Sequence, residues 1–431
     1  MDRFRFLHAA DLHLDTPMEG VAARLPAAWA TRLRDASLLA LDRLVETAIR
    51  EQVAFVLLAG DLYDGPERGA RAQVRLAQAL RRMSEAGIEV LIVQGNHDPL
   101  EDGLAPGSTL PPRVTLFGSR EVGRHEIRCG DRVLATVHGI SYARRETREN
   151  LAQRFHRHGE GFEIGLLHAA VVGASQGHAP YAPCTLDDLQ STRLDYWALG
   201  HIHARQTLGV GSPWVVYPGN PQGRSFKPSE RGAKGAVMVE VERGRVVTAP
   251  SLATLDSLRF VAAEVSIDTL PDWLSLHDAV LAAGDRLATE HAGVDLLVRV
   301  DLRGRGSLHR ELAQPGRSED LLAALRESQT SRNPRLYWVD LSDSTWPDFD
   351  PAALRARGDL LAAVLDRADA LRADPAALAH QLEQLTSSLP NSVASALRRE
   401  RISLDADPER TLRRALDHVV RLLDSGTRRD G

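Results

Sequence analysis

Two histidines lie one residue apart in the segment LGHIHARQ, residues 199–206. Side chains at positions i and i+2 of an extended strand share a face, so His201 and His203 can converge on one point. A second pair with this spacing, Asp11 and His13, stands in ADLHLD near the start of the sequence. Because carboxylates and imidazoles are common ligands of divalent metal ions, both segments are candidates for metal binding.

Three further segments place side chains that could bind a metal directly after an apolar run. They are AGDLYD with Asp61 and Asp64, QGNHDP with Asn96, His97 and Asp98, and GLLHA with His168. Each alone has an ordinary explanation, since such residues also build turns and helix caps. Five such segments at one sheet edge would be five separate coincidences, so we predict a joint metal site.

The predicted ligands are more numerous than one ion takes. They are Asp11, His13, Asp61, Asn96, His168, His201 and His203. This set fits two ions bridged by one carboxylate, for which Asp61 is the candidate. Carboxylate, imidazole and amide donors without a thiolate favour Mn²⁺, Mg²⁺, Fe or Zn²⁺.

Two metal ions held about 3.5 to 4 Å apart suit in-line attack at phosphorus. One ion lowers the pKa of a bound water, and both stabilise the charged oxygens of the phosphate. His97 is not needed as a ligand, so we predict that it protonates the leaving oxygen or holds the phosphate, with Asp98 orienting it. The alternative is that His97 only supports the ligands around it.

The apolar periodicity predicts elements that would bring these segments together. Strands are expected at 4–9, 53–59 and 89–94, and helices at 29–51 and 73–85. A β-α-β-α-β run predicts a parallel sheet, and ligands gather beyond the carboxyl ends of such strands. Glycines at positions 60, 95 and 200 each precede a polar residue, which is consistent with a close approach of the backbone.

The remainder of the chain shows three further patterns. Short strands between 114 and 251 predict a second sheet packed on the first. Strands at 259–268, 294–303 and 335–342, with helices at 271–291 and 319–328, predict a small α+β domain. The stretch 343–351 looks like a linker, and two segments beyond it, LRARGDLLAAVLDRADALRAD and PERTLRRALDHVVRLLDS, have helical apolar spacing. They are either a solvated appendage or a partner-binding helical hairpin.

Composition and charge limit the class of protein. The net charge is −5, so attraction of a nucleic acid would have to be local. Cys129 and Cys184 are the only cysteines, too few for a disulfide framework, which favours a reducing cytoplasm. We find no signal peptide and no apolar run long enough to cross a bilayer, so we expect a soluble cytoplasmic protein without a membrane partner.

The order DxH, GDxxD, GNHD, strand-end His and GHxH, from Asp11 to His203, resembles the calcineurin-like metallophosphoesterase superfamily. The resemblance implies an α/β fold, with a four-layer α-β-β-α sandwich over 1–255, a small α+β capping domain over 256–345 and a helical C-terminal tail over 346–431. The segments YAPCTLDDL, DYWALGHIHARQ and YPGNPQGRSF resemble the bacterial DNA repair exonucleases of the SbcD and YhaO kind, YhaO more closely.

The same resemblance implies roles for residues and partners. One ion would be held by Asp11, His13, Asp61 and His203, and the other by Asp61, Asn96, His168 and His201. The implied activity is manganese-dependent cleavage of DNA phosphodiesters, as an exonuclease or endonuclease in DNA repair. The implied partners are DNA, an SMC-like ATPase bound through the C-terminal helices, and a second copy of the chain in a homodimer.

Some residues depart from the family pattern or fall outside it. Asp64 stands where some nuclease relatives carry a histidine, so its role is open, as is that of Arg224 as a phosphate contact. His8 and His138 are expected to be structural.

Two other functions are weighed against the nuclease. One observation argues against a phosphomonoesterase or small-molecule phosphodiesterase: Gly65 stands directly after the GDxxD motif, where protein phosphatases carry an arginine. A DNA-binding scaffold without catalysis would not need the complete ligand set.

Overall fold

The computed structural model shows a chain that divides into two compact units. The first unit comprises Met1–Ala262, Ala288–Val298 and Arg335–Val339, and the second comprises Ala263–Leu287, Arg299–Pro334 and Asp340–Gly431. The structure describes residues 3–65, 69–102, 110–174, 181–332, 335–346, 348, 351–390, 393, 408, 411–412, 415–416 and 418–420. The division passes through three strands, and the boundaries predicted at 255 and 345 stay predictions.

The first sheet of unit 1 has the strand order β12-β11-β1-β2-β3-β4, with β13 paired to β11. Its strands are β1 (Arg3–Ala9), β2 (Phe55–Ala59), β3 (Glu89–Val93), β4 (Val114–Leu116), β11 (Gly235–Glu242), β12 (Arg245–Val246) and β13 (Ser251–Thr254). Strands β1 to β4 run parallel, so the predicted β-α-β-α-β run is confirmed.

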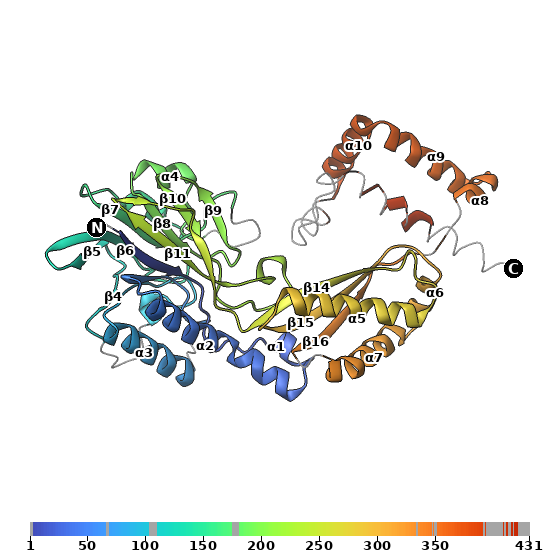
Figure 1. Ribbon diagram of the computed structural model, residues 1–431. Coiled ribbons are helices and arrows are strands. Elements are labelled where there is room, and N and C mark those ends of the chain that lie inside the picture. Colours follow the sequence, from blue (N-terminus) through green and yellow to red (C-terminus); the bar gives the residue numbers. More distant parts are fainter. Residues whose placement is uncertain are drawn as a thin grey trace. The chain divides into compact units, whose positions relative to one another are not determined.

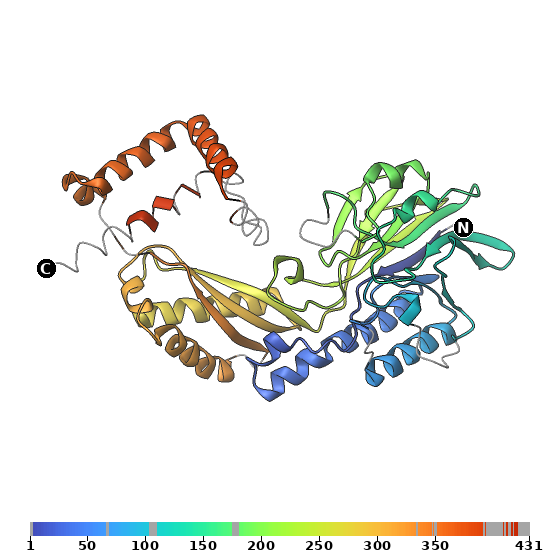
Figure 2. The same cartoon turned by 180° about the vertical axis from the view of Figure 1, so that it is seen from behind.

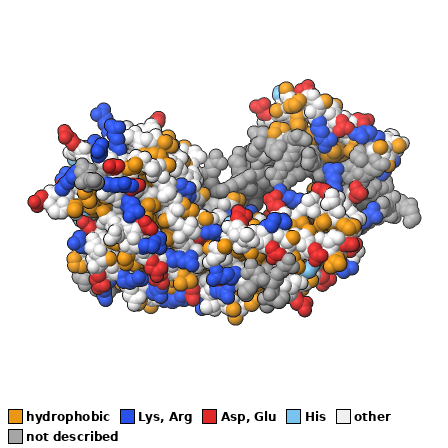
Figure 3. Space-filling model, viewed as in Figure 1, with side chains coloured by type: hydrophobic (Ala, Val, Ile, Leu, Met, Phe, Trp, Pro, Cys, Tyr) orange, Lys and Arg blue, Asp and Glu red, His pale blue; other side chains and the backbone are white. Residues whose placement is uncertain are grey.

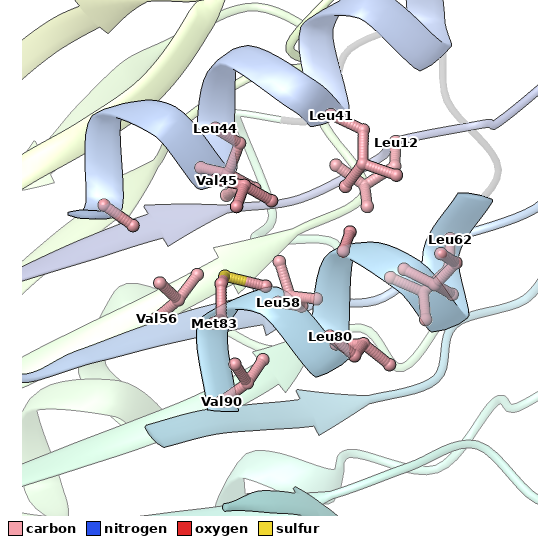
Figure 4. Close-up of a cluster of buried hydrophobic side chains, with 14 of the residues drawn as sticks. Leu12, Leu41, Leu44, Val45, Val56, Leu58, Leu62, Leu80, Met83 and Val90 are labelled. Atoms are coloured by element: carbon pink, nitrogen blue, oxygen red, sulfur yellow. The ribbon is translucent and has the colours of Figure 1, made fainter. Parts of the chain in front are cut away.

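Helices cover the outer face of this sheet. They are α2 (Ala27–Arg50) and α3 (Ala70–Glu85), and the short α1 (Glu19–Ala22) precedes α2. Leu41, Leu44 and Val45 of α2 recur at helical spacing on one face, and they lie against the strands together with Leu80 and Met83 of α3 (Figure 4). This buried apolar layer holds the strand ends that carry the candidate ligands.

The second sheet has the order β5-β6-β7-β8-β10-β9. Its strands are β5 (Gly123–Cys129), β6 (Arg132–Ile140), β7 (Phe162–His168), β8 (Tyr196–Gly200), β9 (Gln206–Gly209) and β10 (Trp214–Tyr217). Tyr196 and Ala198 of β8 pack against the first sheet, whereas Trp197 and Leu199 point to the outer face. That face carries the helix α4 (Leu186–Ser191) and the short η2 (Leu151–Arg154).

Unit 1 is therefore a mixed α/β fold in which two packed sheets are flanked by helices, as expected (Figures 1 and 2). The second sheet was expected to take all the strands between 114 and 251, but β4, β11 and β12 belong to the first sheet. Strand β11 pairs antiparallel with β1. Both of its faces are buried, with Ala236 under the helices and Val237 and Val239 between the sheets. Its apolar run suits a central strand of either sheet, so the local pattern could not decide between them.

A three-stranded sheet of order β14-β15-β16 follows, with the predicted helices beside it (Figures 1 and 2). Its elements are β14 (Leu258–Ser266), α5 (Trp273–Glu290), β15 (Asp295–Arg303), α6 (Leu308–Leu312), α7 (Arg317–Arg332) and β16 (Leu336–Asp343). The short α6 was not predicted from the sequence. The 3-10 turns η1 (Leu100–Asp102) and η3 (Pro228–Glu230) lie in loops of unit 1.

The C-terminal region forms α8 (Pro351–Ala356), α9 (Leu360–Ala373) and α10 (Pro375–Ser388). Gly358, within a segment predicted to be helical, has a φ of 64° and separates α8 from α9. Much of the segment predicted at 408–425 lies outside the described residues, but Leu416 and Val420 are helical and pack against Leu361 and Leu365. Among the described residues, no helix is long and apolar enough to cross a membrane.

Candidate metal centre

The predicted site residues follow the strands of both sheets at their carboxyl ends. Asp11 and His13 follow β1, Asp61 and Asp64 follow β2, Asn96, His97 and Asp98 follow β3, His168 ends β7, and His201 and His203 follow β8. Because β1, β2 and β3 are parallel neighbours, their loops leave the first sheet at one edge. The face-to-face packing of β2 and β3 with β7 brings the histidines of the second sheet to the same edge.

The first cluster consists of Asp11, His13 and His203, whose donor atoms all lie within 4.8 Å of one another. The Nε2 atoms of His13 and His203 are 3.1 Å apart. On the opposite side of each ring, His13 Nδ1 lies 3.0 Å from Asp64 Oδ1 and His203 Nδ1 lies 2.6 Å from Glu230 Oε1. An ionised carboxylate only accepts hydrogen bonds, so His203 Nδ1 carries the proton and leaves its Nε2 lone pair facing His13.

The electrostatics of these partners support that assignment. Burial alone would raise the pKa of Glu230, but the hydrogen bond from His203 and nearby charges lower it to about 2. Burial alone would also raise the pKa of Asp64, but the contacts with His13 and Arg224 outweigh it and lower this pKa to about 2. Burial lowers the pKa of His13 to about 4, although Asp64 opposes this shift. An ionised carboxylate therefore lies beside the Nδ1 atom of each histidine, and the two facing Nε2 atoms suit a cation between them.

The second cluster consists of Asp11, Asp61 and His168, again with all donor atoms within 4.8 Å of one another. His168 Nε2 lies 3.4 Å from Asp61 Oδ2 and 3.1 Å from Asn96 Oδ1, while Nδ1 donates to the Ala59 carbonyl at 2.9 Å. Burial lowers the pKa of His168, but the charge and hydrogen bond of Asp61, the Asp11 charge and the Ala59 hydrogen bond together raise it to about 9. The pair thus shares a proton, whose place a metal ion would take.

Asp61 belongs to the second cluster and also lies near His13 of the first. Its Oδ2 is 3.4 Å from His168 Nε2 and 3.9 Å from His13 Nε2, and its Oδ1 accepts from the His97 N–H at 2.9 Å. Burial raises the pKa of Asp11, and the charge of Asp61 adds to this shift while histidines oppose it. Two buried carboxylates so close together favour a cation, so the donor set fits divalent metal ions. Asp11 is the residue common to both clusters, and the bridging role of Asp61 stays a prediction.

His201 is held differently from the other predicted ligands. Its backbone N–H lies 3.1 Å from both carboxylate oxygens of Asp11. Its ring centroid is 5.4 Å from that of His168 and 5.8 Å from that of Tyr181. Among the described residues, its ring stands beside the second cluster rather than within a donor cluster. Its role as a ligand stays a prediction.

Four of the predicted ligands have left-handed backbone. The φ angles are 55° at Asp11, 41° at His13, 52° at Asp61 and 100° at His201. Residues other than glycine adopt this region at a cost of about 1–3 kcal/mol each, and they keep it where the surrounding structure holds them. Such conformations concentrate at functional sites, so this edge of the sheets differs from an ordinary set of turns.

The three glycines named from the sequence surround His168 and Asp61. An ideal Cβ would lie 2.3 Å from His168 Nδ1 at Gly60, 2.3 Å from Asp61 Oδ1 at Gly95, and 1.8 Å from the Ala59 carbonyl oxygen at Gly200. These positions leave no room for a side chain. The expected close approach is confirmed: the backbone approaches the candidate ligands themselves.

His97 and Asp98 have different surroundings. The His97 side chain is 35% exposed at the rim, and its Nδ1 lies 3.3 Å from Asp64 Oδ1. Asp98 is fully buried, and its carboxylate accepts from the Leu62 N–H at 2.8 Å and the Gly95 N–H at 3.0 Å. Asp64, rather than Asp98, is thus the carboxylate beside His97. Burial and the charge of Asp61 raise the pKa of Asp98 to about 7, against the two backbone hydrogen bonds.

Two residues of the loop before β11 complete the surroundings of the first cluster. Arg224 Nη2 donates to Asp64 Oδ2 at 2.6 Å. Glu230, which sequence reasoning missed, accepts from His203 and, through Oε2, from Asn220 Nδ2 at 2.7 Å. Glu230 stands in the charged run KPSERGAKG, where no spacing distinguishes it from a surface residue.

The two histidines expected to be structural lie outside the clusters. His8 is fully buried, with Nδ1 3.1 Å from the Tyr196 hydroxyl and Nε2 3.2 Å from the Leu199 carbonyl. Burial lowers the pKa of His8 to about 3, and the Leu199 hydrogen bond only partly opposes this. His138 Nε2 lies 3.1 Å from Glu163 Oε2 in the second sheet.

Comparisons with known proteins identify the class. The Calcineurin-like phosphoesterase family model matches residues 4–205, and the model of the middle domain of metallophosphoesterase YhaO matches residues 260–344. Together with a relative that is 35% identical over most of both chains, these matches show that the chain belongs to the calcineurin-like metallophosphoesterase family.

That relative is the uncharacterized metallophosphoesterase YhaO of Bacillus subtilis, and the match covers 79% of this chain and 81% of that protein. A subunit of the nuclease SbcCD of Bacillus subtilis is 25% identical over 72% of this chain and 84% of its own length. DNA double-strand break repair protein Mre11 of Methanopyrus kandleri is 26% identical, covering 56% of this chain and 55% of that protein.

Proposed function

We propose that the chain is a divalent-metal-dependent DNA phosphodiesterase, an exonuclease or endonuclease acting in DNA repair. The observation that carries this proposal is that Asp11 joins two donor clusters and Asp61 lies near both His13 and His168, with the partly exposed His97 beside them. Similarity to the SbcCD nuclease and to Mre11 supports DNA as the substrate.

Each candidate ligand would then have a defined place. Asp11, His13, Asp61 and His203 would hold one ion, and Asp61, Asn96, His168 and His201 the other. Two such ions, for which Mn²⁺ is our first candidate, would polarise the phosphate and acidify a water. This chemistry accounts for a donor set that is buried apart from the partly exposed His203.

The remaining polar residues would orient and transfer a proton. His97 is close enough to the cluster, and exposed enough, to donate a proton to the leaving oxygen of a bound phosphodiester. Asp64 lies beside the His97 ring and would orient it. Asp98 would act through the backbone, because it ties the loops after β2 and β3 together.

Electrostatic attraction of DNA would be local. The chain carries a net charge of −5, and the face in Figure 3 shows basic and acidic side chains interspersed. A cluster that binds divalent cations would itself attract phosphates.

The proposed partners include an SMC-like ATPase and a second copy of the chain in a homodimer, and the proposed setting is cytoplasmic. A relative that is named as part of a nuclease complex supports the first. Helix α9 contributes Val364, Ala368 and Leu371 to an apolar groove of about 280 Å³ that Leu412 and Leu416 complete. Such a groove in the C-terminal region suits the binding of a partner helix.

The test uses the purified full-length chain with Mn²⁺, end-labelled duplex DNA and a chromogenic phosphomonoester. We expect DNA degradation that His97→Ala abolishes while the variant still binds metal, and that Asn96→Ala reduces with weaker metal binding. His380→Ala, at an exposed histidine of α10, is the matched control and should cleave like the unmodified chain.

Two results would contradict the proposal. Monoester turnover without DNA cleavage would indicate a phosphomonoesterase, and DNA binding without any turnover would indicate a scaffold. Loss of metal in His97→Ala would show that His97 is a ligand and not an acid. Light scattering after size exclusion measures whether the chain is a dimer.

A further inference from the structure

The histidines of the two proposed metal positions are backed by different groups. At the first position, His13 Nδ1 lies 3.0 Å from the Asp64 carboxylate and His203 Nδ1 lies 2.6 Å from the Glu230 carboxylate. At the second position, His168 Nδ1 donates to the neutral carbonyl of Ala59. The hydrogen bonds of His203 and His168 set the tautomer that leaves Nε2 available as a ligand. A negative charge lies beside the Nδ1 atom only at the first position, for His13 and His203.

That difference affects the strength of the ligand. A carboxylate behind an imidazole withdraws its proton partly and makes the opposite nitrogen a stronger donor to a metal ion. Residues in such positions typically change metal affinity about 10- to 100-fold when they are replaced. A neutral carbonyl orients the ring without adding charge, so it gives a smaller increase in donor strength.

The two carboxylates are themselves held by one loop of unit 1, between β10 and β11. Glu230 Oε2 accepts from Asn220 Nδ2 at 2.7 Å and from the Arg224 backbone N–H at 3.1 Å. The Arg224 guanidinium donates to Asp64 Oδ2 at 2.6 Å. Glu230 is buried and Asp64 is partly buried, so solvent screens the charge of Glu230 little and that of Asp64 more.

We propose that Glu230 and Asp64 are positioning residues that make the position formed with His13 and His203 the tighter of the two metal positions. The proposal rests on the dinuclear centre of the proposed function. It predicts two unequal classes of metal binding, with the first ion held at this position and the second at the position that includes His168 and Asn96.

The experiment titrates chelator-treated full-length protein with Mn²⁺ and measures free Mn²⁺ by electron paramagnetic resonance, without substrate. We expect two classes whose dissociation constants differ at least about tenfold. Glu230→Gln keeps a group that can accept from His203 but loses the charge, and it should weaken the tight class about 10- to 100-fold. Asp64→Asn should weaken the same class, and Asn96→Ala only the weak one.

Glu89→Gln is the matched control, because Glu89 Oε2 also lies 2.6 Å from a histidine nitrogen, Nε2 of His125, outside the site. It should change neither class. Circular dichroism of each apo-protein verifies folding, and Asp64→Asn keeps the test decisive where Glu230→Gln does not fold. The proposal is overturned when the charge-neutral variants weaken both classes equally, the weak class alone or neither class. Two classes that behave as expected without DNA cleavage would overturn the proposed function alone.

Discussion

Replacing Gly95 by alanine tests whether the candidate centre depends on the close approach of the loop after β3. An ideal Cβ at Gly95 would lie 2.3 Å from Asp61 Oδ1 and 2.9 Å from two ring carbons of His168. The backbone of Gly95 has no positive φ, so alanine can adopt it. The substitution therefore changes the packing around two candidate ligands and leaves the backbone preference unaltered.

Neither neighbour of the added methyl group has room to retreat. His168 is fully buried and tied to the Ala59 carbonyl at 2.9 Å, and Asp61 Oδ1 accepts from the His97 N–H at 2.9 Å. To reach the 3.0 Å that real Cβ contacts keep, the Asp61 oxygen must move about 0.7 Å. Overpacking of this kind costs about 1–3 kcal/mol. Metal–ligand distances hold within about 0.2 Å, so we expect at least about a tenfold loss of metal affinity.

Urea unfolding followed by circular dichroism, with a chelator and then with Mn²⁺, measures both effects. Gly95→Ala should lose about 1–3 kcal/mol without metal. It should also gain about 1.4 kcal/mol less from saturating Mn²⁺ than the unmodified chain does. Gly161→Ala is the control, since an added Cβ there meets no atom within 4 Å. If Gly95→Ala matched the unmodified chain in both measurements, the idea of a centre crowded by its glycines would be wrong.

Three further predictions concern stability. The pKa of His8 is about 3 in the folded chain and 6.5 in the unfolded chain. Below pH 6.5 the unfolded chain takes up a proton that the folded chain does not, so stability falls by about 1.4 kcal/mol per pH unit towards pH 3. His8→Gln should therefore flatten the pH dependence of the urea midpoint between pH 7 and 5, and parallel curves would contradict this. Asp98→Asn replaces one of the two oxygens that accept from the Leu62 and Gly95 N–H groups by an NH2 group, and it should cost about 1–3 kcal/mol in urea unfolding. Unchanged stability would show that Asp98 does not hold the loops after β2 and β3 together. Chelation should lower the melting temperature, because a ligand at 100 times its Kd adds about 2.7 kcal/mol; a melting temperature insensitive to Mn²⁺ would argue against a bound ion.

The parts of the centre that follow parallel strands could be predicted from the sequence, because their signals are local. An apolar run, a glycine and a polar residue recur at Asp61 and Asn96, and the order of the strands follows from the alternating helices. Parallel neighbours put the ends of their strands at one edge, so three of the five segments had to meet there.

Contacts that depend on the path of a loop could not be predicted. Glu230 reaches His203 across 27 residues, and Arg224 reaches Asp64 across 160. The partner of β11 is β1, at the other end of unit 1 in sequence, and the apolar pattern of β11 would suit either sheet. The carboxylate beside His97 is Asp64 rather than the expected Asp98 for the same reason, since adjacency in sequence does not set the direction of a side chain.

The backbone at the candidate ligands connects the fold to metal binding. At a lower bound of about 1 kcal/mol each, the left-handed conformations of Asp11, His13, Asp61 and His201 together approach the net stability of a small domain. A chain with no ion to bind would gain stability by relaxing these turns and by separating the two buried carboxylates. Cation binding offsets both costs at once, because it neutralises the carboxylates and holds the strained side chains in place. The strain is therefore best explained by a centre that works in its metal-bound state.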